Sequence, residues 1–132
     1  MLQIGKLAKK AGCLVQTVRF YESEGLLPPP ARSEGNFRLY DDVHLQRLLF
    51  IRRCRAKDMT LDEIRQLLSF RDRPDLDCGE VNTLVDSHIV QVRAKIKELR
   101  ALERELMDLR SSCDSARTAG ECGILSSLAE PA

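Results

Sequence analysis

The chain has 132 residues with nearly balanced charge, 21 Lys or Arg against 20 Asp or Glu. That length allows one modest core, or one small domain with an extension. Because the sequence has no apolar run of the roughly 20 residues that cross a membrane and no secretory pattern at its start, we expect a cytoplasmic protein without a membrane partner.

The charge is unevenly distributed along the chain. Residues 1–57 hold 11 Lys or Arg and five Asp or Glu, whereas the remaining residues hold 10 and 15. A basic first part followed by an acidic second part favours a polyanionic partner for the first part alone.

Two short helices joined by a tight turn are predicted at the amino terminus, the second from about Val15 to Glu24 and the turn at Gly12. In each helix the apolar residues share one face: Ile4, Leu7, Ala8 and Ala11 in the first, and Val15, Val18 and Phe20 in the second. This pattern is typical of a helix-turn-helix, whose second helix meets the DNA major groove.

A small two-stranded wing is predicted to follow. The prolines at 28–30 favour extended backbone, residues 33–36 form a turn signal, and residues 37–40 alternate as a short strand. Asp41 is predicted to cap a helix that runs to about Arg55, and Thr60 with Glu63 forms a capping box that opens another helix. Residues 1–72 are therefore expected to form a winged helix-turn-helix domain, and residues 73–79 a linker.

A long helix is predicted over residues 80–112. Its apolar or nearly apolar positions recur in steps of three or four residues, as in a coiled-coil seam: Val81, Val85, His88, Val92, Ile96, Leu99, Leu102, Leu106, Leu109 and Cys113. At about 1.5 Å per residue, such a helix measures on the order of 45–50 Å, and its own chain offers no helix of matching length. We therefore expect a homodimer, with a loop and one short helix in residues 113–132. The expected fold is mainly α.

Three cysteines flank the long helix, with Cys78 before it and Cys113 and Cys122 after it. If the helix pairs antiparallel with its copy, Cys78 of one protomer meets Cys113 and Cys122 of the other. Three thiolates suit Pb²⁺ or Hg²⁺, or Cd²⁺ with an added ligand, better than Zn²⁺, which normally takes four ligands.

The other candidate ligands have structural alternatives. Cys113 alone could be a small buried seam residue, and we expect Cys13 and Cys54 to pack in the core of the first domain. His88 is expected to be an interface histidine, with a role as an outer metal ligand left open.

Several motifs resemble the MerR family of bacterial regulators. They are residues 4–8, 17–22, 25–27, 32–40 and 52–64. The second half, through residues 77–82 and through Cys113 and Cys122 with the Gly-Ile-Leu that follows, resembles the cadmium- and lead-responsive branch of that family.

Eight residues are predicted to contact DNA. Gln16, Thr17 and Arg19 lie at the exposed start of the second helix, and Arg19 and Tyr21 can reach phosphates. The resemblance implies that four wing residues contact the flanking backbone: Arg32, Asn36, Arg38 and Tyr40. For Tyr21 and Tyr40 the alternative is packing inside the domain.

The resemblance also implies a mechanism. The dimer would bind double-stranded operator DNA between promoter elements that are too far apart, and the metal-bound form would distort that DNA so that RNA polymerase can engage. The residues around the cysteines favour Pb²⁺ or Cd²⁺ as the effector, while Hg²⁺ and Zn²⁺ remain alternatives.

Other functional classes fit less well. The sequence has no Ser/His/Asp grouping, Gly-rich phosphate loop or carboxylate pair in context, so we predict that it is not an enzyme. An iron–sulfur redox sensor would need four clustered cysteines. A coiled-coil adaptor without metal sensing remains the alternative from another class, but it leaves the basic wing unexplained.

Overall fold

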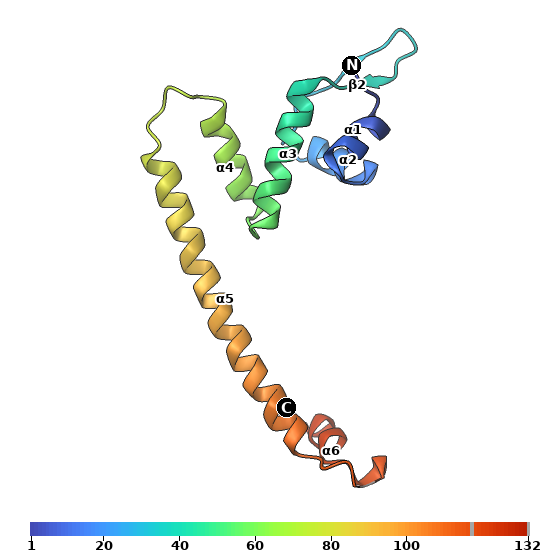
Figure 1. Ribbon diagram of the computed structural model, residues 1–132, viewed down its shortest axis with the longest axis vertical. Coiled ribbons are helices and arrows are strands. Elements are labelled where there is room, and N and C mark those ends of the chain that lie inside the picture. Colours follow the sequence, from blue (N-terminus) through green and yellow to red (C-terminus); the bar gives the residue numbers. More distant parts are fainter. Residues whose placement is uncertain (117, 132) are drawn as a thin grey trace. The chain divides into compact units, whose positions relative to one another are not determined.

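The computed structural model describes residues 1–116 and 118–131, and it is mainly helical (Figure 1). In chain order the elements are α1 (Ile4–Ala11), α2 (Val15–Ser23), β1 (Ala31–Arg32), β2 (Arg38–Leu39), α3 (Asp42–Ala56), α4 (Leu61–Arg71), α5 (Gly79–Ser111), the short 3₁₀ helix η1 (Ala119–Glu121) and α6 (Gly123–Ala129). The chain divides into two compact units, Met1–Leu84 and Val85–Ala132. Among the described helices, none is both long enough and apolar enough to cross a membrane.

The helix-turn-helix forms as predicted, and α1 ends where its sequence requires. Gly12 adopts the left-handed conformation at φ 71°, which favours glycine, and its amide bonds back to the last turn of α1. The expectation that Phe20 faces inward was wrong, because 47% of it is exposed while Tyr21 is buried. Helical periodicity explains the difference. Tyr21 lies three residues after the buried Val18 and so shares its face of the helix, whereas Phe20 lies two residues after Val18 and points to another face.

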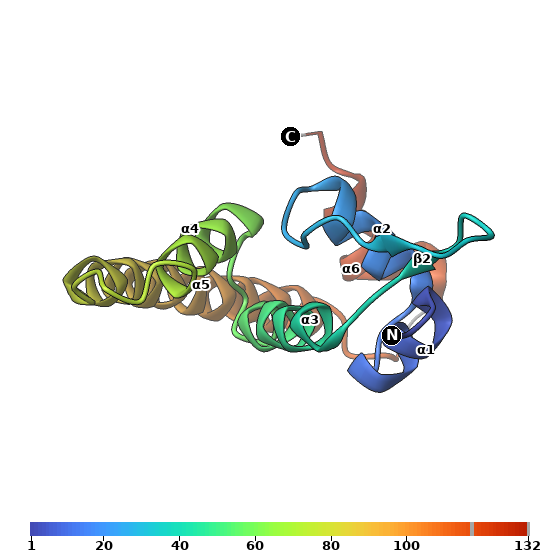
Figure 2. The same cartoon turned by 90° about the horizontal axis from the view of Figure 1, so that it is seen from above.

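The wing consists of β1 and β2, which pair antiparallel with Ala31 opposite Leu39 and Arg32 opposite Arg38. Leu2 extends this pairing, since the amides of Leu2 and Tyr40 each donate to the other residue's carbonyl at 2.7 Å. The amino terminus therefore lies beside the wing, as Figures 1 and 2 show.

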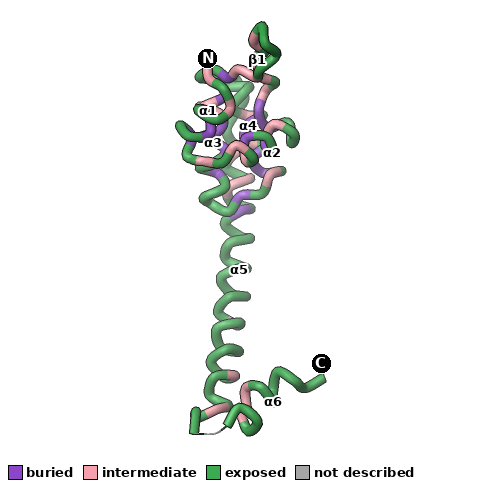
Figure 3. The backbone as a smooth tube through the Cα atoms, turned by 90° about the vertical axis from the view of Figure 1, so that its right-hand side faces the viewer, coloured by how far each residue is buried: buried purple, intermediate pink, exposed green. Residues whose placement is uncertain are grey.

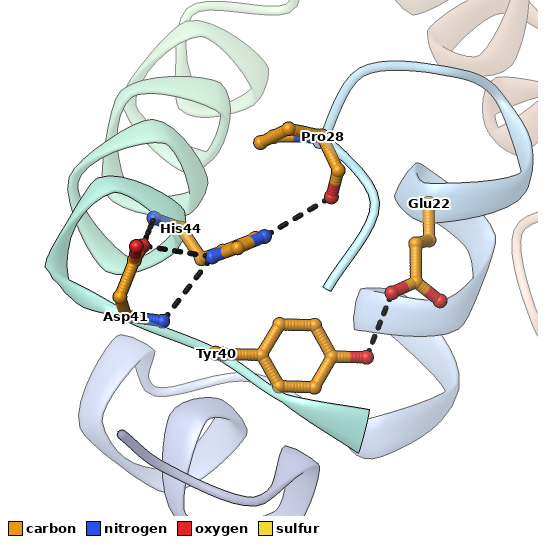
Figure 4. Close-up of polar contacts among 5 residues, drawn as sticks. All are labelled: Glu22, Pro28, Tyr40, Asp41 and His44. Carbon is orange, nitrogen blue, oxygen red and sulfur yellow. Dashed lines mark hydrogen bonds and ion pairs between the residues drawn. The ribbon is translucent and has the colours of Figure 1, made fainter. Parts of the chain in front are cut away.

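Both predicted helix caps are present. The Asp41 side chain accepts a bond from the His44 amide, and the Thr60 side chain accepts one from the Glu63 amide, each with a reciprocal bond that completes a capping box. In the capping box at Asp41, the reciprocal bond goes to the side chain of His44, the third residue of α3. The His44 ring is buried, and its Nε2 lies 3.0 Å from the Pro28 carbonyl oxygen (Figure 4).

The core of the first unit lies where the helices meet. Its fully buried aliphatic side chains come from every helix of the domain: Leu7 from α1, Val18 from α2, Leu48 and Ile51 from α3, and Ile64 and Leu68 from α4, with Leu26 from the segment after α2. Because helices on all sides contribute to one core, the domain can hold the wing and α2 in a defined arrangement.

Helix α5 has 33 residues and is exposed along most of its length (Figure 3). Large aliphatic side chains of the predicted seam are among the exposed residues: Val92, Ile96, Leu99, Leu102 and Leu106. In the second unit, α6 turns back beside the carboxyl end of α5, as Figures 1 and 3 both show. The predicted short carboxyl-terminal helix is therefore confirmed.

Candidate functional site

Three arginines line one hollow in the first unit. The hollow measures about 570 Å³, and its lining residues come from the amino terminus, α2 and the wing: Gln3, Ile4, Arg19, Arg32, Asn36, Phe37 and Arg38. A guanidinium group can form strong, bidentate hydrogen bonds with phosphate. The structure thus brings together Arg19, Arg32, Asn36 and Arg38, four of the predicted DNA-contacting residues.

The wing turn holds two of these residues in place. Asn36 has a left-handed backbone at φ 63°, which asparagine tolerates better than most residues. Its amide donates to the Ser33 carbonyl at 2.9 Å, and the Phe37 amide donates to Ser33 Oγ at 3.1 Å. Arg32 Nη1 then donates to the Asn36 carbonyl at 3.1 Å, so the turn orients the Arg32 side chain.

Helix α2 presents its other predicted residues on different faces. Gln16 and Arg19 are exposed, and Thr17 is half-buried. Tyr21 lies on the core side, 7% exposed, with its ring centroid 5.7 Å from that of Phe20. The exposed face of α2 can therefore meet a nucleic acid through Gln16 and Arg19, whereas the Tyr21 ring packs inside the domain.

The structure places Tyr40 in the core. Of the two possibilities given for this residue, packing inside the domain fits the structure better than a contact with a DNA phosphate. Its exposed fraction is 0%, its ring meets His44 edge-on at 5.1 Å, and its hydroxyl donates to Glu22 Oε1 at 2.7 Å (Figure 4). Burial, followed by the hydrogen bond to Glu22 and its negative charge, raises the pKa of Tyr40 to about 12. Arg38 Nη1 lies 3.6 Å from the other Glu22 oxygen, so Glu22 links the buried tyrosine to the arginine hollow.

Tyr40→Phe is expected to lower the free energy of unfolding by about 1–3 kcal/mol at pH 7, because a buried hydrogen bond to a carboxylate is lost while the ring packing is kept. The raised pKa of Tyr40 stabilises the fold below the unfolded tyrosine value of about 10, and this contribution is lost as the pH rises towards 12. In denaturant unfolding, the difference in free energy of unfolding between wild type and variant should therefore be constant from pH 7 to 9 and decrease above pH 10. A difference in free energy of unfolding that does not change up to pH 12 would contradict the stabilising role of the protonated Tyr40 hydroxyl.

Sequence reasoning missed Gln3, Ile4 and Phe37 as lining residues of the arginine hollow. The bridge between Leu2 and Tyr40 brings the first two there, and no local sequence signal announces that bridge. Phe37 did carry a sequence signal, because it is an aromatic residue directly after the polar turn of the wing. In the structure, 63% of its surface is exposed.

Two of the three predicted metal ligands meet in the second unit. Cys113 and Cys122 are half-buried and not part of a disulfide. A hydrogen bond from the Leu125 amide, and then one with the Cys113 side chain, hold the pKa of Cys122 below its ordinary value, and the positive charge of Arg110 acts in the same direction. A thiol of lowered pKa more readily supplies the thiolate that binds a metal.

Cys78 lies in the first unit and is exposed. It borders a hollow of about 270 Å³ whose other walls are mainly apolar, among them Phe50, Leu67 and Phe70. Within one chain, the described residues include no group of three or more His, Cys, Asp or Glu side chains placed to hold a metal ion.

The remaining cysteines behave as expected of core residues. Cys54 is buried, and Cys13 packs against the same core. Burial raises the pKa of both thiols, which keeps them protonated and poor metal ligands. His88 is buried on α5, and its role as an outer ligand stays a prediction.

Comparison with known proteins gives consistent matches along the chain. A model of the MerR HTH family regulatory proteins matches residues 2–70, and a second model, MerR, DNA binding, matches residues 45–109. The HTH-type transcriptional regulator ZntR homolog of Haemophilus influenzae is 47% identical over 109 residues, which cover 83% of this chain and 81% of the relative.

Solved structures agree with these matches. The crystal structure of the transcription regulator PbrR691 from Ralstonia metallidurans CH34 in complex with lead(II) is 84% identical, with a TM-score of 0.85, over 98% of this chain and 100% of the other. The crystal structure of HiNmlR, a MerR family regulator lacking the sensor domain and bound to promoter DNA, is 26% identical with a TM-score of 0.61, over 98% and 96%.

Proposed function

The chain belongs to the MerR family of helix-turn-helix regulatory proteins, and we propose that it is a metal-responsive transcription regulator that binds operator DNA as a homodimer. The observation that carries the metal response is the direct meeting of Cys113 and Cys122 beside the end of α5, with the pKa of Cys122 lowered. The relatives are regulators, so the function is binding and not catalysis.

The homodimer is proposed from the exposed seam of α5, with residues 80–112 as the dimerisation segment. Near the carboxyl end of the helix, a groove of about 520 Å³ is lined mainly by Leu99, Leu102, Leu106 and Met107, together with Glu103, Arg110 and Ser111. Apolar surface of this extent is unfavourable in water, and the same face of a second copy would cover it.

The metal site is proposed to combine Cys78 of one protomer with Cys113 and Cys122 of the other. Cys78 precedes a helix of 33 residues, which measures about 50 Å at 1.5 Å per residue, and Cys113 follows it. Only an antiparallel arrangement of two such helices brings the start of one beside the end of its copy. The exposure of Cys78 supports this arrangement, because a ligand completed by a partner must be accessible in the single chain.

The three thiolates fit a soft divalent ion. Pb²⁺ is proposed in a three-sulfur site, and Cd²⁺ would take these thiolates and one further donor. PbrR691, whose crystal structure contains lead(II), is 84% identical to this chain, and this similarity supports the choice of Pb²⁺. Hg²⁺ and Zn²⁺ are the alternatives, since both bind thiolate and Zn²⁺ would need a fourth ligand.

The DNA interface is proposed on residues 1–72, where α2 faces the major groove and the wing contacts the flanking backbone. The proposed contacts are Gln16, Thr17, Arg19, Arg32, Asn36 and Arg38; Tyr21 and Tyr40 are left out because their rings are buried. A two-fold symmetric dimer of such domains would bind a palindromic operator. RNA polymerase is the proposed partner at the promoter.

The metal is proposed to change the shape of the operator and not to release the protein from it. Bending or untwisting a site of this length costs a few kcal/mol, which is within the free energy that a multi-thiolate site joining two protomers can supply. The bound dimer would then bring the promoter elements into a geometry that polymerase accepts.

A promoter reporter titrated with Pb²⁺, Cd²⁺, Zn²⁺ and Hg²⁺ tests this function. We expect induction by Pb²⁺ and Cd²⁺ at lower concentrations than by the other two ions. The residues around the cysteines resemble the cadmium- and lead-responsive branch, which favours these ions over Hg²⁺, and a site of three thiolates lacks the fourth ligand that Zn²⁺ normally takes. In parallel, footprinting should show an operator that stays occupied while the cleavage pattern at its centre changes. Induction by Zn²⁺ alone or Hg²⁺ alone would contradict the choice of metal, and loss of occupancy would contradict the distortion mechanism.

A further inference from the structure

Gly123 makes an unusually close backbone contact in the second unit. It is the first residue of α6 and directly follows Cys122. A methyl group added at its Cα would overlap the backbone carbonyl oxygen of Ser112 and come within 3.1 Å of the carbonyl carbon. Figures 1 and 3 show the corresponding arrangement, with α6 folded back beside the end of α5.

This contact joins the chain neighbours of the two thiols, since Ser112 precedes Cys113 and Gly123 follows Cys122. A Cβ carbon does not approach a carbonyl oxygen closer than van der Waals contact, and a backbone carbonyl cannot rotate away as a flexible side chain can. A side chain at position 123 would therefore push the two backbones apart by about 1 Å. Metal–sulfur distances in a binding site vary by only about 0.2 Å, so a displacement of this size would disturb the site.

The backbone on both sides of the contact is held by hydrogen bonds. Arg110 Nη1 donates to the Cys113 carbonyl at 2.8 Å, and the Cys122 amide donates to the Ala119 carbonyl at 3.2 Å. The Ser126 amide then donates to the Cys122 carbonyl at 3.1 Å. Because these bonds fix each cysteine to its own segment, a displacement at Gly123 moves Cys122 away from Cys113.

We propose that Gly123 is a positioning residue that sets the spacing of the Cys113–Cys122 pair, because a residue without Cβ lets α6 start against the last carbonyls of α5. The role of the pair as metal ligands rests on the proposed function, whereas the spacing itself does not. The effect is one of space, because a purely local helix preference would make alanine at this first helical position favourable compared with glycine.

The chain offers a matched control at Gly120. A methyl group there would have Thr118 Oγ1, at 3.9 Å, as its nearest neighbour, which is ordinary contact. Gly123→Ala and Gly120→Ala thus make the same chemical change three residues apart, and only the first meets a backbone carbonyl. Both variants are made in the full-length protein, with circular dichroism and operator affinity of the metal-free form as checks on folding.

The first measurement is the rate at which Cys113 and Cys122 form a disulfide with diamide, which accepts the two electrons and two protons of the thiols. Because a disulfide requires closely spaced Cβ atoms, we expect Gly123→Ala to slow this reaction by at least about tenfold, whereas Gly120→Ala stays within about twofold of wild type. Peptide mass spectrometry identifies the bond. Equal rates in Gly123→Ala and wild type would overturn the proposal.

The second measurement is Pb²⁺ affinity by chelator competition. We expect Gly123→Ala to bind Pb²⁺ at least about tenfold more weakly than wild type and Gly120→Ala, the range found when the support of a metal ligand is removed. Unchanged affinity in Gly123→Ala would overturn its role at the metal site. If wild type itself binds no Pb²⁺, the proposed function fails, and the disulfide rates still decide whether Gly123 sets the spacing.

Discussion

Replacing Cys78, Cys113 or Cys122 individually by serine is expected to abolish induction by metal and to weaken Pb²⁺ binding by at least about a hundredfold. Removing the support of a ligand already costs 10–100-fold, so losing one of three proposed thiolates should cost more. Reporter induction and chelator competition measure the two effects. Operator affinity of the metal-free protein should not change, because none of the three cysteines lines the arginine hollow.

Cys13→Ala is the control for this experiment. It removes a thiol that packs against the core, so it should leave induction intact. Full induction in Cys78→Ser would remove that residue from the site and reduce the proposal to the pair at the end of α5.

Mixed dimers test whether the site is shared between chains. One chain carries Cys78→Ser and the other carries Cys113→Ser with Cys122→Ser. If the ligands come from both chains, each mixed dimer keeps one intact site and should bind one Pb²⁺ ion with affinity near that of wild type. If they came from one chain, no intact site would remain, and the mixture would bind no better than either parent.

Arg19→Ala and Arg38→Ala are each expected to weaken operator binding by roughly a hundredfold. A charge-assisted bond to phosphate contributes about 1.5 kcal/mol, and a dimer loses two of them. The slope of log affinity against log salt should fall by about two in magnitude for the same reason, and competitor DNA should be affected equally because phosphate contacts do not read sequence. Fluorescence anisotropy over a range of salt concentrations measures both quantities.

Arg104→Ala is the matched control, because it removes one exposed positive charge per chain from α5, outside the first unit. It should leave both affinity and salt slope near the wild-type values. An effect of Arg104→Ala as large as that of Arg19→Ala would mean that net charge, and not the arginine hollow, governs binding. Native mass measurements on each variant should show the proposed dimer, which separates a lost DNA contact from lost dimerisation.

The features that the sequence determined by itself depend on residues close together in the chain. The caps at Asp41 and Thr60, the end of α1 at Gly12 and the length of α5 were all predicted and are present. Each rests on hydrogen bonds or periodicity over three to seven residues, which local composition dictates whatever the rest of the fold does. The family resemblance was readable for the same reason, since its motifs are short and contiguous.

Tertiary structure alone decided which side chains remain available for function. The hydroxyl of the buried Tyr40 donates to Glu22, 18 residues away, and the hollow depends on the bridge between Leu2 and Tyr40. The contact of Gly123 with Ser112 likewise depends on how α6 folds back on α5. These contacts join segments that are distant in sequence, and their geometry comes from packing of whole elements, so a pattern of neighbouring residues could name the cysteines and arginines but could not place them.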